Sequence, residues 1–292
     1  MCVRAHADAA AKRLGHPVKV AARVQTHPDE AIRYGTDVFA WAREGLVDLV
    51  IPCNFLDCAD YALPLKEWKE RLAAANPGVK VIPGTDNGVT KEYRNWKNRQ
   101  LFTGPELRGF VERLLAQGAE GFYFFNHFDM GRATEAGRYL SVAGELDAAK
   151  IAALPRAYPV TYRDSTLNHK HAGNQLPLAL AASKGRVSIA SGKVPAAGTC
   201  DVLLGFGKAP PAEGLFATVS LNGVLPLRRE PVSASYWLGR TPESVASFKV
   251  HYPLAALKDD VNVLEIGGVP SEADLRAVEL EVFPAPTHSD AD

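Results

Sequence analysis

Short apolar runs alternate with amphipathic segments through the first half of the chain, and this alternation limits the folds available to it. Runs typical of strands cover residues 18–24, 47–53, 79–84 and 119–128. Helical periodicity marks the segments around them, at 3–15, 27–45, 64–78, 104–118 and 132–154. Strands that alternate with helices form parallel sheets, and nearly all-apolar strands indicate a sheet covered by helices.

Two architectures fit this alternation, a TIM barrel and an open doubly wound sheet. No G-x-G-x-x-G motif follows a strand and opens a helix, so a dinucleotide-binding fold lacks its main support. Four strand–helix units make only half of an eight-stranded barrel. The sequence therefore predicts that residues 1–154 form a partial, half TIM-like βα barrel of about four parallel strands.

The pattern changes near residue 155. Helical periodicity gives way to short alternating runs separated by Gly, Pro, Asn and Ser, including GRVSIA, CDVLLGFG, LFATVSLNG, SFKVHYPL, NVLEIGG and RAVELEVF. This spacing is typical of an antiparallel β-sandwich or jelly roll. We therefore predict an α/β plus all-β protein with a β-sandwich at 155–286 and a disordered tail at 287–292.

Charge and composition exclude several functions. The 33 basic and 33 acidic side chains balance, which argues against a nucleic-acid partner held by a basic face. No apolar run approaches the roughly 20 residues that span a bilayer, so no membrane partner is expected. The first residues lack the apolar core of a secretory signal, which predicts a cytoplasmic protein as given, or a secreted or periplasmic one if its natural start lies upstream.

Four cysteines are too few for a disulfide scaffold. Cys53 and Cys58 form a single C-x4-C pair, and a zinc site there requires His or Asp ligands from elsewhere in the chain. We expect neither a metal nor a cofactor.

Polar side chains follow each predicted strand, where a TIM barrel places its active site. Among these side chains, the best local pair of carboxyl groups for catalysis is Asp86 and Asp57. The candidate substrate-binding residues are Arg23, Asn54, Asn87, Glu92, Trp96, Tyr123, Asn126 and His127. Phe125 and Phe128 add aromatic rings that could form a binding platform with Tyr123.

Simpler interpretations remain open for several of these residues. Asp86 and Asn87 follow Pro83 and Gly84, a composition in which Asp and Asn cap backbone amides in a turn. The polar pair at 126–127 equally fits a role in satisfying nearby backbone groups. Arg23 lies inside a strand of Val and Ala, where an unpaired charge is costly to bury, so we expect it to pair with an acidic residue such as Asp86.

Three phrases resemble the C-terminal half of bacterial glycoside-hydrolase-like TIM barrels of the family-10 type. They are GTDVFAWAREGLVDLVIPCNF, VKVIPGTDN and GAEGFYFFNHF, and the resemblance covers residues 15–160. It implies strands five to eight of the barrel, and it leaves no counterpart for strand four, which carries the acid/base Glu in that family. In the second half, ATVSLNG and YPLAALKDDVNVLEI resemble galactose-binding-like β-sandwich domains.

The leading hypothesis is a glycoside hydrolase-like protein that acts on or binds carbohydrate, with either an active barrel or a truncated or inactive one. The alternative is a non-catalytic carbohydrate-binding or scaffolding protein, in which the half-barrel supports the sandwich. A fragment of a longer enzyme also fits. Because half a barrel exposes two strand edges and its inner face, the sequence predicts a homo-oligomer.

Overall fold

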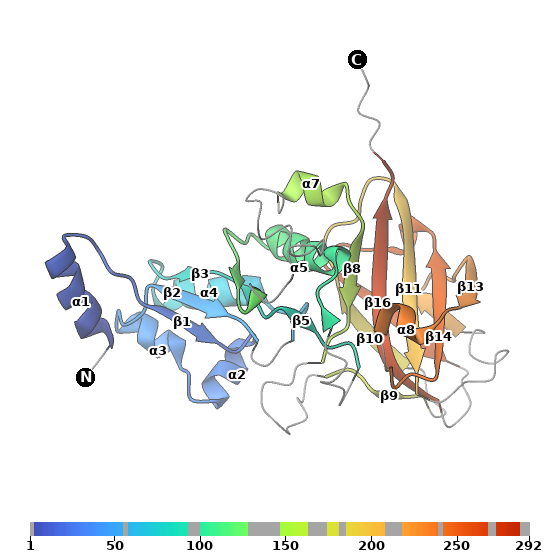
Figure 1. Ribbon diagram of the computed structural model, residues 1–292, viewed down its shortest axis with the longest axis horizontal. Helices are drawn as coiled ribbons and strands as arrows, with labels where there is room; N and C mark the ends of the chain where they lie inside the picture. The colour runs from blue at the N-terminus through green and yellow to red at the C-terminus, as the bar shows by residue number, and fades with distance from the viewer. Residues whose placement is uncertain are drawn as a thin grey trace, which may run out of the picture.

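The computed structural model of the protein describes residues 3–54, 58–92, 100–127, 147–162, 174–180, 185–207, 218–238, 242–267 and 273–286. Figure 1 shows a region of helices and short strands beside a region of long antiparallel strands. Asp57, Trp96 and Phe128 lie outside the described residues. No helix in the described ranges is both long enough and apolar enough to span a membrane.

The parallel strands follow one another in chain order. Strands β1 (Ala21–Val24), β2 (Leu49–Pro52) and β3 (Lys80–Val81) form a parallel sheet in the order β1-β2-β3. Just beyond β3, β4 (Gly84–Thr85) pairs in parallel with β7 (Tyr123–Phe124). Strands β3 and β4 both overlap the predicted strand at 79–84, and they pair with β2 and β7 respectively. All four predicted strands are therefore parallel. The described strands form no closed barrel.

Helices precede, connect and follow these strands, although their boundaries differ from the prediction. They are α1 (Val3–Leu14), α2 (Pro28–Arg33), α3 (Val38–Arg43), α4 (Leu65–Ala75), α5 (Gly104–Ala116) and α7 (Ala148–Ala152). The single helix predicted over 27–45 is wrong. Gly35 has a φ of +82°, and the Asp37 side chain accepts a hydrogen bond from the Ala40 amide to start α3. A left-handed glycine followed by an N-cap residue divides the segment into two helices.

One face of the parallel strands packs against these helices. Val24 and Val50 from the strands share a hydrophobic core with Trp68 of α4 and with Leu107 and Phe110 of α5, and all five are essentially inaccessible. Helix α5 begins with a capping box between Thr103 and Glu106. The apolar stripes seen in the sequence therefore cover the strands as expected.

The second region consists of two antiparallel sheets. One has the order β13-β14-β11-β16-β8, with β9 also paired to β16, and the other has the order β10-β15-β12. The strands are β8 (Arg156–Pro159), β9 (Leu178–Ala179), β10 (Gly185–Ala190), β11 (Gly198–Phe206), β12 (Thr218–Leu221), β13 (Arg228–Pro231), β14 (Ala246–Tyr252), β15 (Val261–Gly267) and β16 (Asp274–Pro284). All six predicted runs contain a strand; β8, β9 and β13 were not predicted, nor was the short helix α8 (Ala234–Leu238).

The long polar connection predicted after residue 85 also contains structure. Strands β5 (Gly88–Val89) and β6 (Gln100–Leu101) pair antiparallel within it. Lys91, just after β5, has its ammonium nitrogen 2.6 Å from Glu106 Oε1 and 2.5 Å from Glu279 Oε2. Because Glu279 lies on β16, this buried ionic cluster joins the connection to the large antiparallel sheet.

Helix α5 packs closely against the antiparallel region. A Cβ atom added at Gly109 of α5 would lie 2.2 Å from the Ala157 carbonyl oxygen on β8. Only glycine lets the helix backbone approach the strand this closely. The hydrophobic core continues across the contact, from Trp68 and Phe110 to Val202 and Leu280 of the antiparallel sheet.

Candidate functional site

The ends of all four parallel strands meet in one cluster, to which Asn54 and Asn126 contribute backbone carbonyl oxygens. Arg23 of β1 donates a hydrogen bond to the Asn54 carbonyl oxygen, just after β2, and its Nη2 lies 3.9 Å from Asp86 Oδ2, just after β4. The Asn87 side-chain amide donates to the carbonyl oxygen of Asn126, just after β7, at 2.9 Å. We name these residues, with His127, the strand-end cluster. The predicted pairing of Arg23 with Asp86 is confirmed.

Asp86 both caps a turn, as one interpretation of the sequence predicted, and faces a cation. Its Oδ1 accepts a hydrogen bond from the Asn87 amide at 2.8 Å, which is turn chemistry. Its Oδ2 faces the Arg23 guanidinium. The carboxylate therefore shapes the turn after β4 and also holds a cation that belongs to β1.

Aromatic side chains extend from the strand-end cluster. The Arg23 guanidinium carbon lies 3.7 Å from the centre of the Phe125 ring, and Phe125 stacks beside Tyr123 at 6.3 Å. A cation over an aromatic face at this distance is a favourable electrostatic contact. At Gly84 an added Cβ would lie 2.9 Å from Cys53 Cβ and 3.1 Å from Tyr123 Cδ1. The absent side chain at Gly84 leaves room for Tyr123 beside β4.

His127 occupies an apolar part of the strand-end cluster. Its ring stacks on Phe102 at 5.8 Å and lies 4.9 Å from the Phe124 ring. Neither ring nitrogen makes a hydrogen bond of good geometry within the described residues. Burial lowers the pKa of His127 to about 4, although the nearby Asp86 opposes the shift. His127 is therefore a neutral imidazole at pH 7.

The lowered pKa of His127 predicts a loss of stability in acid. As the pH falls from 6.5 to about 4, the unfolded chain gains a proton on this histidine and the folded protein does not. The free energy of unfolding should fall by up to about 3 kcal/mol across this window. Urea unfolding at several pH values measures the effect. His127→Phe should reduce the slope, whereas His6→Asn, a change at an exposed histidine, should preserve it. Equal slopes in all three proteins would contradict the assignment.

Exposure divides the predicted residues into two groups. Asn54, Asp86, Asn87 and His127 are at most 4% exposed and form the interior of the strand-end cluster. The partly exposed group is Arg23, Tyr123, Phe125 and Asn126. A ligand that meets the cluster in this conformation contacts the partly exposed group, and the buried group fixes the positions of those side chains.

Glu92 contacts a different part of the protein. Its carboxylate accepts hydrogen bonds from the amides of Glu243 and Ser244 at 2.9 Å, and also from the Ser244 hydroxyl. These bonds attach the chain after β5 to the loop before β14. The structure therefore does not place Glu92 with the strand-end cluster.

Sequence reasoning did not assign Cys53 to the strand-end cluster. Cys53 is fully buried at the end of β2, and burial raises the pKa of its thiol to about 11, with Arg23 acting in the opposite direction. Its thiol and that of Cys58 each donate to a backbone carbonyl oxygen, of Asn54 and Tyr162 respectively. Across the described residues, no group of three or more His, Cys, Asp or Glu side chains is arranged to hold a metal ion.

Comparison with solved structures finds distant neighbours. No protein-family model and no curated protein matches the chain. The structure of BuGH86 with neoagarooctaose shares 14% identity over 44% of this chain, with a TM-score of 0.28. BpGH86A, a β-porphyranase of glycoside hydrolase family 86 from the human gut bacterium Bacteroides plebeius, shares 10% identity over 93% of this chain, with a TM-score of 0.27.

The chain spans only 18% of the BuGH86 structure, and 70% of the porphyranase structure. These neighbours are carbohydrate-active enzymes of family 86, not of the family-10 type that the sequence resembles. TM-scores this low carry no argument about the function of this chain. The functional argument therefore depends on the strand-end cluster itself.

Proposed function

We propose that the protein binds carbohydrate at the strand-end cluster. The observation that carries this proposal is the hydrogen-bonded meeting of four parallel strand ends, with Arg23 lying on the ring of Phe125. Sugar rings present C–H groups that pack on aromatic faces, and their hydroxyls bond to charged and amide groups. Tyr123 and Phe125 offer aromatic rings, with Arg23 covering one face of Phe125, and Arg23 and Asn126 offer the polar groups.

Asp86 positions the Arg23 side chain at this site. It is 1% exposed and faces the guanidinium of Arg23, so it fixes the direction of the Arg23 donors. Hydrolysis of a glycosidic bond requires a second carboxyl group, about 5 Å away for retention or roughly 6.5–9.5 Å away for inversion. The sequence offers Asp57 for this role. Binding needs no second carboxylate, so the binding function is the part of the hypothesis that the geometry supports best.

The proposal extends to the lineage of the chain. In it, residues 1–154 are the C-terminal half of a glycosidase-like barrel and residues 155–286 are a galactose-binding-like β-sandwich. The parallel order of β1, β2, β3/β4 and β7 supports the first part, and the two antiparallel sheets support the second. Self-association of the half-barrel belongs to the same proposal.

Calorimetric titration with soluble oligosaccharides of glucose, galactose, mannose and xylose tests the binding function. At least one sugar should bind, and Phe125→Ala should weaken it at least tenfold because the aromatic face and the contact with Arg23 are lost. Tyr34→Ala is the matched control, since Tyr34 is 46% exposed at the end of α2. Asp86→Asn should weaken binding less than Phe125→Ala.

Two results would contradict the proposal. One is the absence of binding by every sugar in the panel. The other is equal affinity in the wild-type, Phe125→Ala and Tyr34→Ala proteins, which would place any sugar site elsewhere, as the scaffolding alternative requires.

A further inference from the structure

We propose that a second site, independent of the strand-end cluster, binds a small amphiphile with one carboxylate head on an apolar body. The site is a cavity of about 660 Å³ between α5, α7, the chain at 193–197 and the end of β16. Cavities that bind small molecules usually have volumes of 300–1,000 Å³, with apolar walls and a few polar groups that orient the ligand. We name it the α7 cavity.

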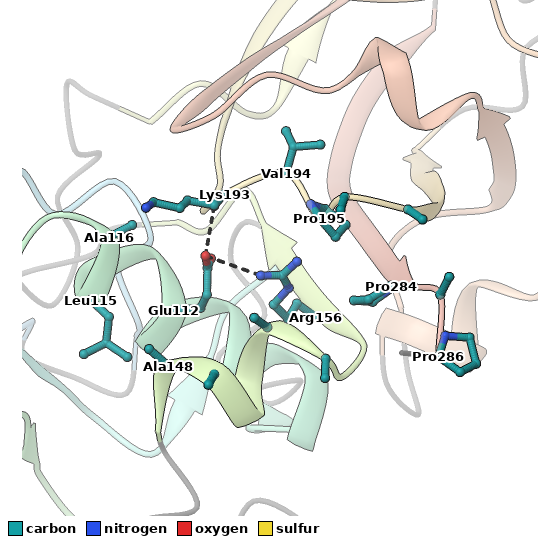
Figure 2. A pocket seen from close by; sticks show the side chains of 16 residues that line it. Glu112, Leu115, Ala116, Ala148, Arg156, Lys193, Val194, Pro195, Pro284 and Pro286 are labelled. Carbon is teal, nitrogen blue, oxygen red and sulfur yellow. Dashed lines mark hydrogen bonds and ion pairs between the residues drawn. The ribbon is translucent and has the colours of Figure 1, made fainter. Parts of the chain in front are cut away.

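The walls of the α7 cavity suit an apolar body. Helix α7 contributes only alanine side chains to them, and the opposite wall carries Val194, Pro195 and Pro284 (Figure 2). Several wall residues, including Ala148, Ala152 and Pro286, are exposed to solvent. The cavity is therefore reachable from water, although its walls offer hardly any hydrogen-bonding side chains to a sugar or another polyol.

A buried cation forms the polar end of the cavity. The Arg156 side chain is 1% exposed and lies among the lining residues, close to Glu112 (Figure 2). Its Nη1 is 3.3 Å from Glu112 Oε1. Its Nε and Nη2 atoms are buried and have no hydrogen-bond partner among the residues that the structure describes. Buried donors without a partner cost free energy, so a ligand that satisfies them gains affinity.

The two unpartnered atoms indicate the chemistry of the head group. The N–H groups of Nε and Nη2 lie on the same edge of a guanidinium and point in parallel, which matches the two oxygens of a carboxylate. Glu112 uses the other side of the guanidinium, at Nη1. A carboxylate that docks on the free edge therefore completes the hydrogen bonds of Arg156 without displacing Glu112.

Glu112 is itself held in place. Its Oε1 accepts from the Lys193 amide at 2.9 Å, and its Oε2 accepts from the Tyr158 hydroxyl at 2.8 Å. A Cβ atom at Gly192 would lie 1.3 Å from Glu112 Oε2, so only glycine at this position admits the carboxylate. These two hydrogen bonds hold the Glu112 carboxylate away from the free edge of Arg156.

The charges around the cavity favour an anion. Among the lining residues, Arg156 and Lys193 are positive and Glu112 is negative, which leaves one positive charge. The single anionic head of the proposed ligand balances this charge. A neutral amphiphile with the same apolar body lacks this interaction and should bind more weakly.

Calorimetric titration of the full chain with decanoate and with decan-1-ol, both below their aggregation concentrations, tests the proposal. Decanoate should bind at one site and at least tenfold more tightly than decan-1-ol. Ala152→Trp should weaken decanoate binding at least tenfold by filling the cavity from an exposed position of α7. Ala74→Trp, at an exposed alanine on α4, is the matched control and should bind as the wild type does.

A second variant tests the guanidinium edge separately from the cavity. Arg156→Lys keeps a positive charge beside Glu112 but removes the parallel donors, so the preference for decanoate over decan-1-ol should fall at least fivefold. Thermal unfolding establishes that each variant is folded. Equal affinities for the acid and the alcohol, no binding of decanoate, or unchanged binding by Ala152→Trp would each overturn the proposal.

Discussion

Lys91→Met is expected to lower the free energy of unfolding by about 3–5 kcal/mol, because it leaves two buried carboxylates without their shared cation. The Lys91 ammonium lies 2.6 Å from Glu106 Oε1 and 2.5 Å from Glu279 Oε2, and it also donates to the Trp237 carbonyl oxygen at 3.0 Å. Methionine preserves most of the length of the side chain. The loss of stability therefore comes from removing the charge and not from creating a cavity. Urea unfolding measures it.

The control is Lys80→Met, which breaks the ion pair between Lys80 and Glu120. That pair is 3.5 Å long with both side chains more than 60% exposed, and exposed pairs contribute no more than about 1 kcal/mol. Similar losses in the two variants would contradict the role assigned to the buried cluster.

The same cluster should respond to pH. Burial raises the pKa of Glu279 from 4.5 to about 7, although Lys91 opposes the shift. Between these values the folded protein holds a proton that the unfolded chain has lost, so the contribution of Glu279 to stability falls as the pH rises from 4.5 to 7. The loss caused by Lys91→Met should accordingly be greater at pH 8 than at pH 5.5.

The order of the parallel strands was predictable because each strand is a local apolar run. Strand type depends on a few neighbouring residues, and consecutive strands joined by helices pair in parallel. The division of the helix at Gly35 was less visible, because the apolar pattern continues across the break. Only the turn chemistry of Gly35 and Asp37 marks it.

Contacts between the two regions were not predictable from the sequence. Lys91 and Glu279 are separated by 188 positions, and no local pattern relates them. Gly109 lies inside an amphipathic helix. In the sequence it stands out only because glycine is a weak helix former. The backbone of β8, which makes this glycine necessary, was not itself predicted as a strand.

The candidate site was predictable in part, for a geometric reason. Polar residues at the ends of neighbouring parallel strands should lie along one edge. There Arg23 does face Asp86, and Asn87 does bond to the Asn126 carbonyl oxygen. The residue types did not reveal which of these side chains are buried. Glu92 resembled a cleft residue in the sequence because it lies in a charged segment, yet its carboxylate binds the backbone at Ser244.

The structure also shows how the short parallel strands and their helices acquire a core. Helix α5 packs on β8 through Gly109, and Tyr158 of β8 donates to Glu112 of α5. The antiparallel region thereby covers the helix that lies against the parallel strands. Through this contact the antiparallel region covers part of the parallel-strand region, while self-association of the chain stays a prediction.

Trp68→Ala is expected to lower the free energy of unfolding by about 3–5 kcal/mol and also to weaken the strand-end cluster. Trp68 of α4 is fully buried, stacks on Phe39 at 5.6 Å, and donates from its indole nitrogen to the Thr26 carbonyl oxygen at 2.7 Å. Thr26 follows β1 by two residues. The indole therefore fixes the strand end from which Arg23 reaches Asp86.

Two comparisons separate packing from positioning at Trp68. Trp68→Phe keeps most of the aromatic contact with Phe39 but loses the bond to Thr26, so it should cost about 1–3 kcal/mol. Ile32→Ala, at a 42% exposed position of α2, should cost less than about 1 kcal/mol. If Trp68→Phe weakens oligosaccharide binding while the protein remains fully folded, the indole positions β1 for the ligand. If only Trp68→Ala weakens binding, and in proportion to its unfolding, Trp68 acts on the site through stability alone.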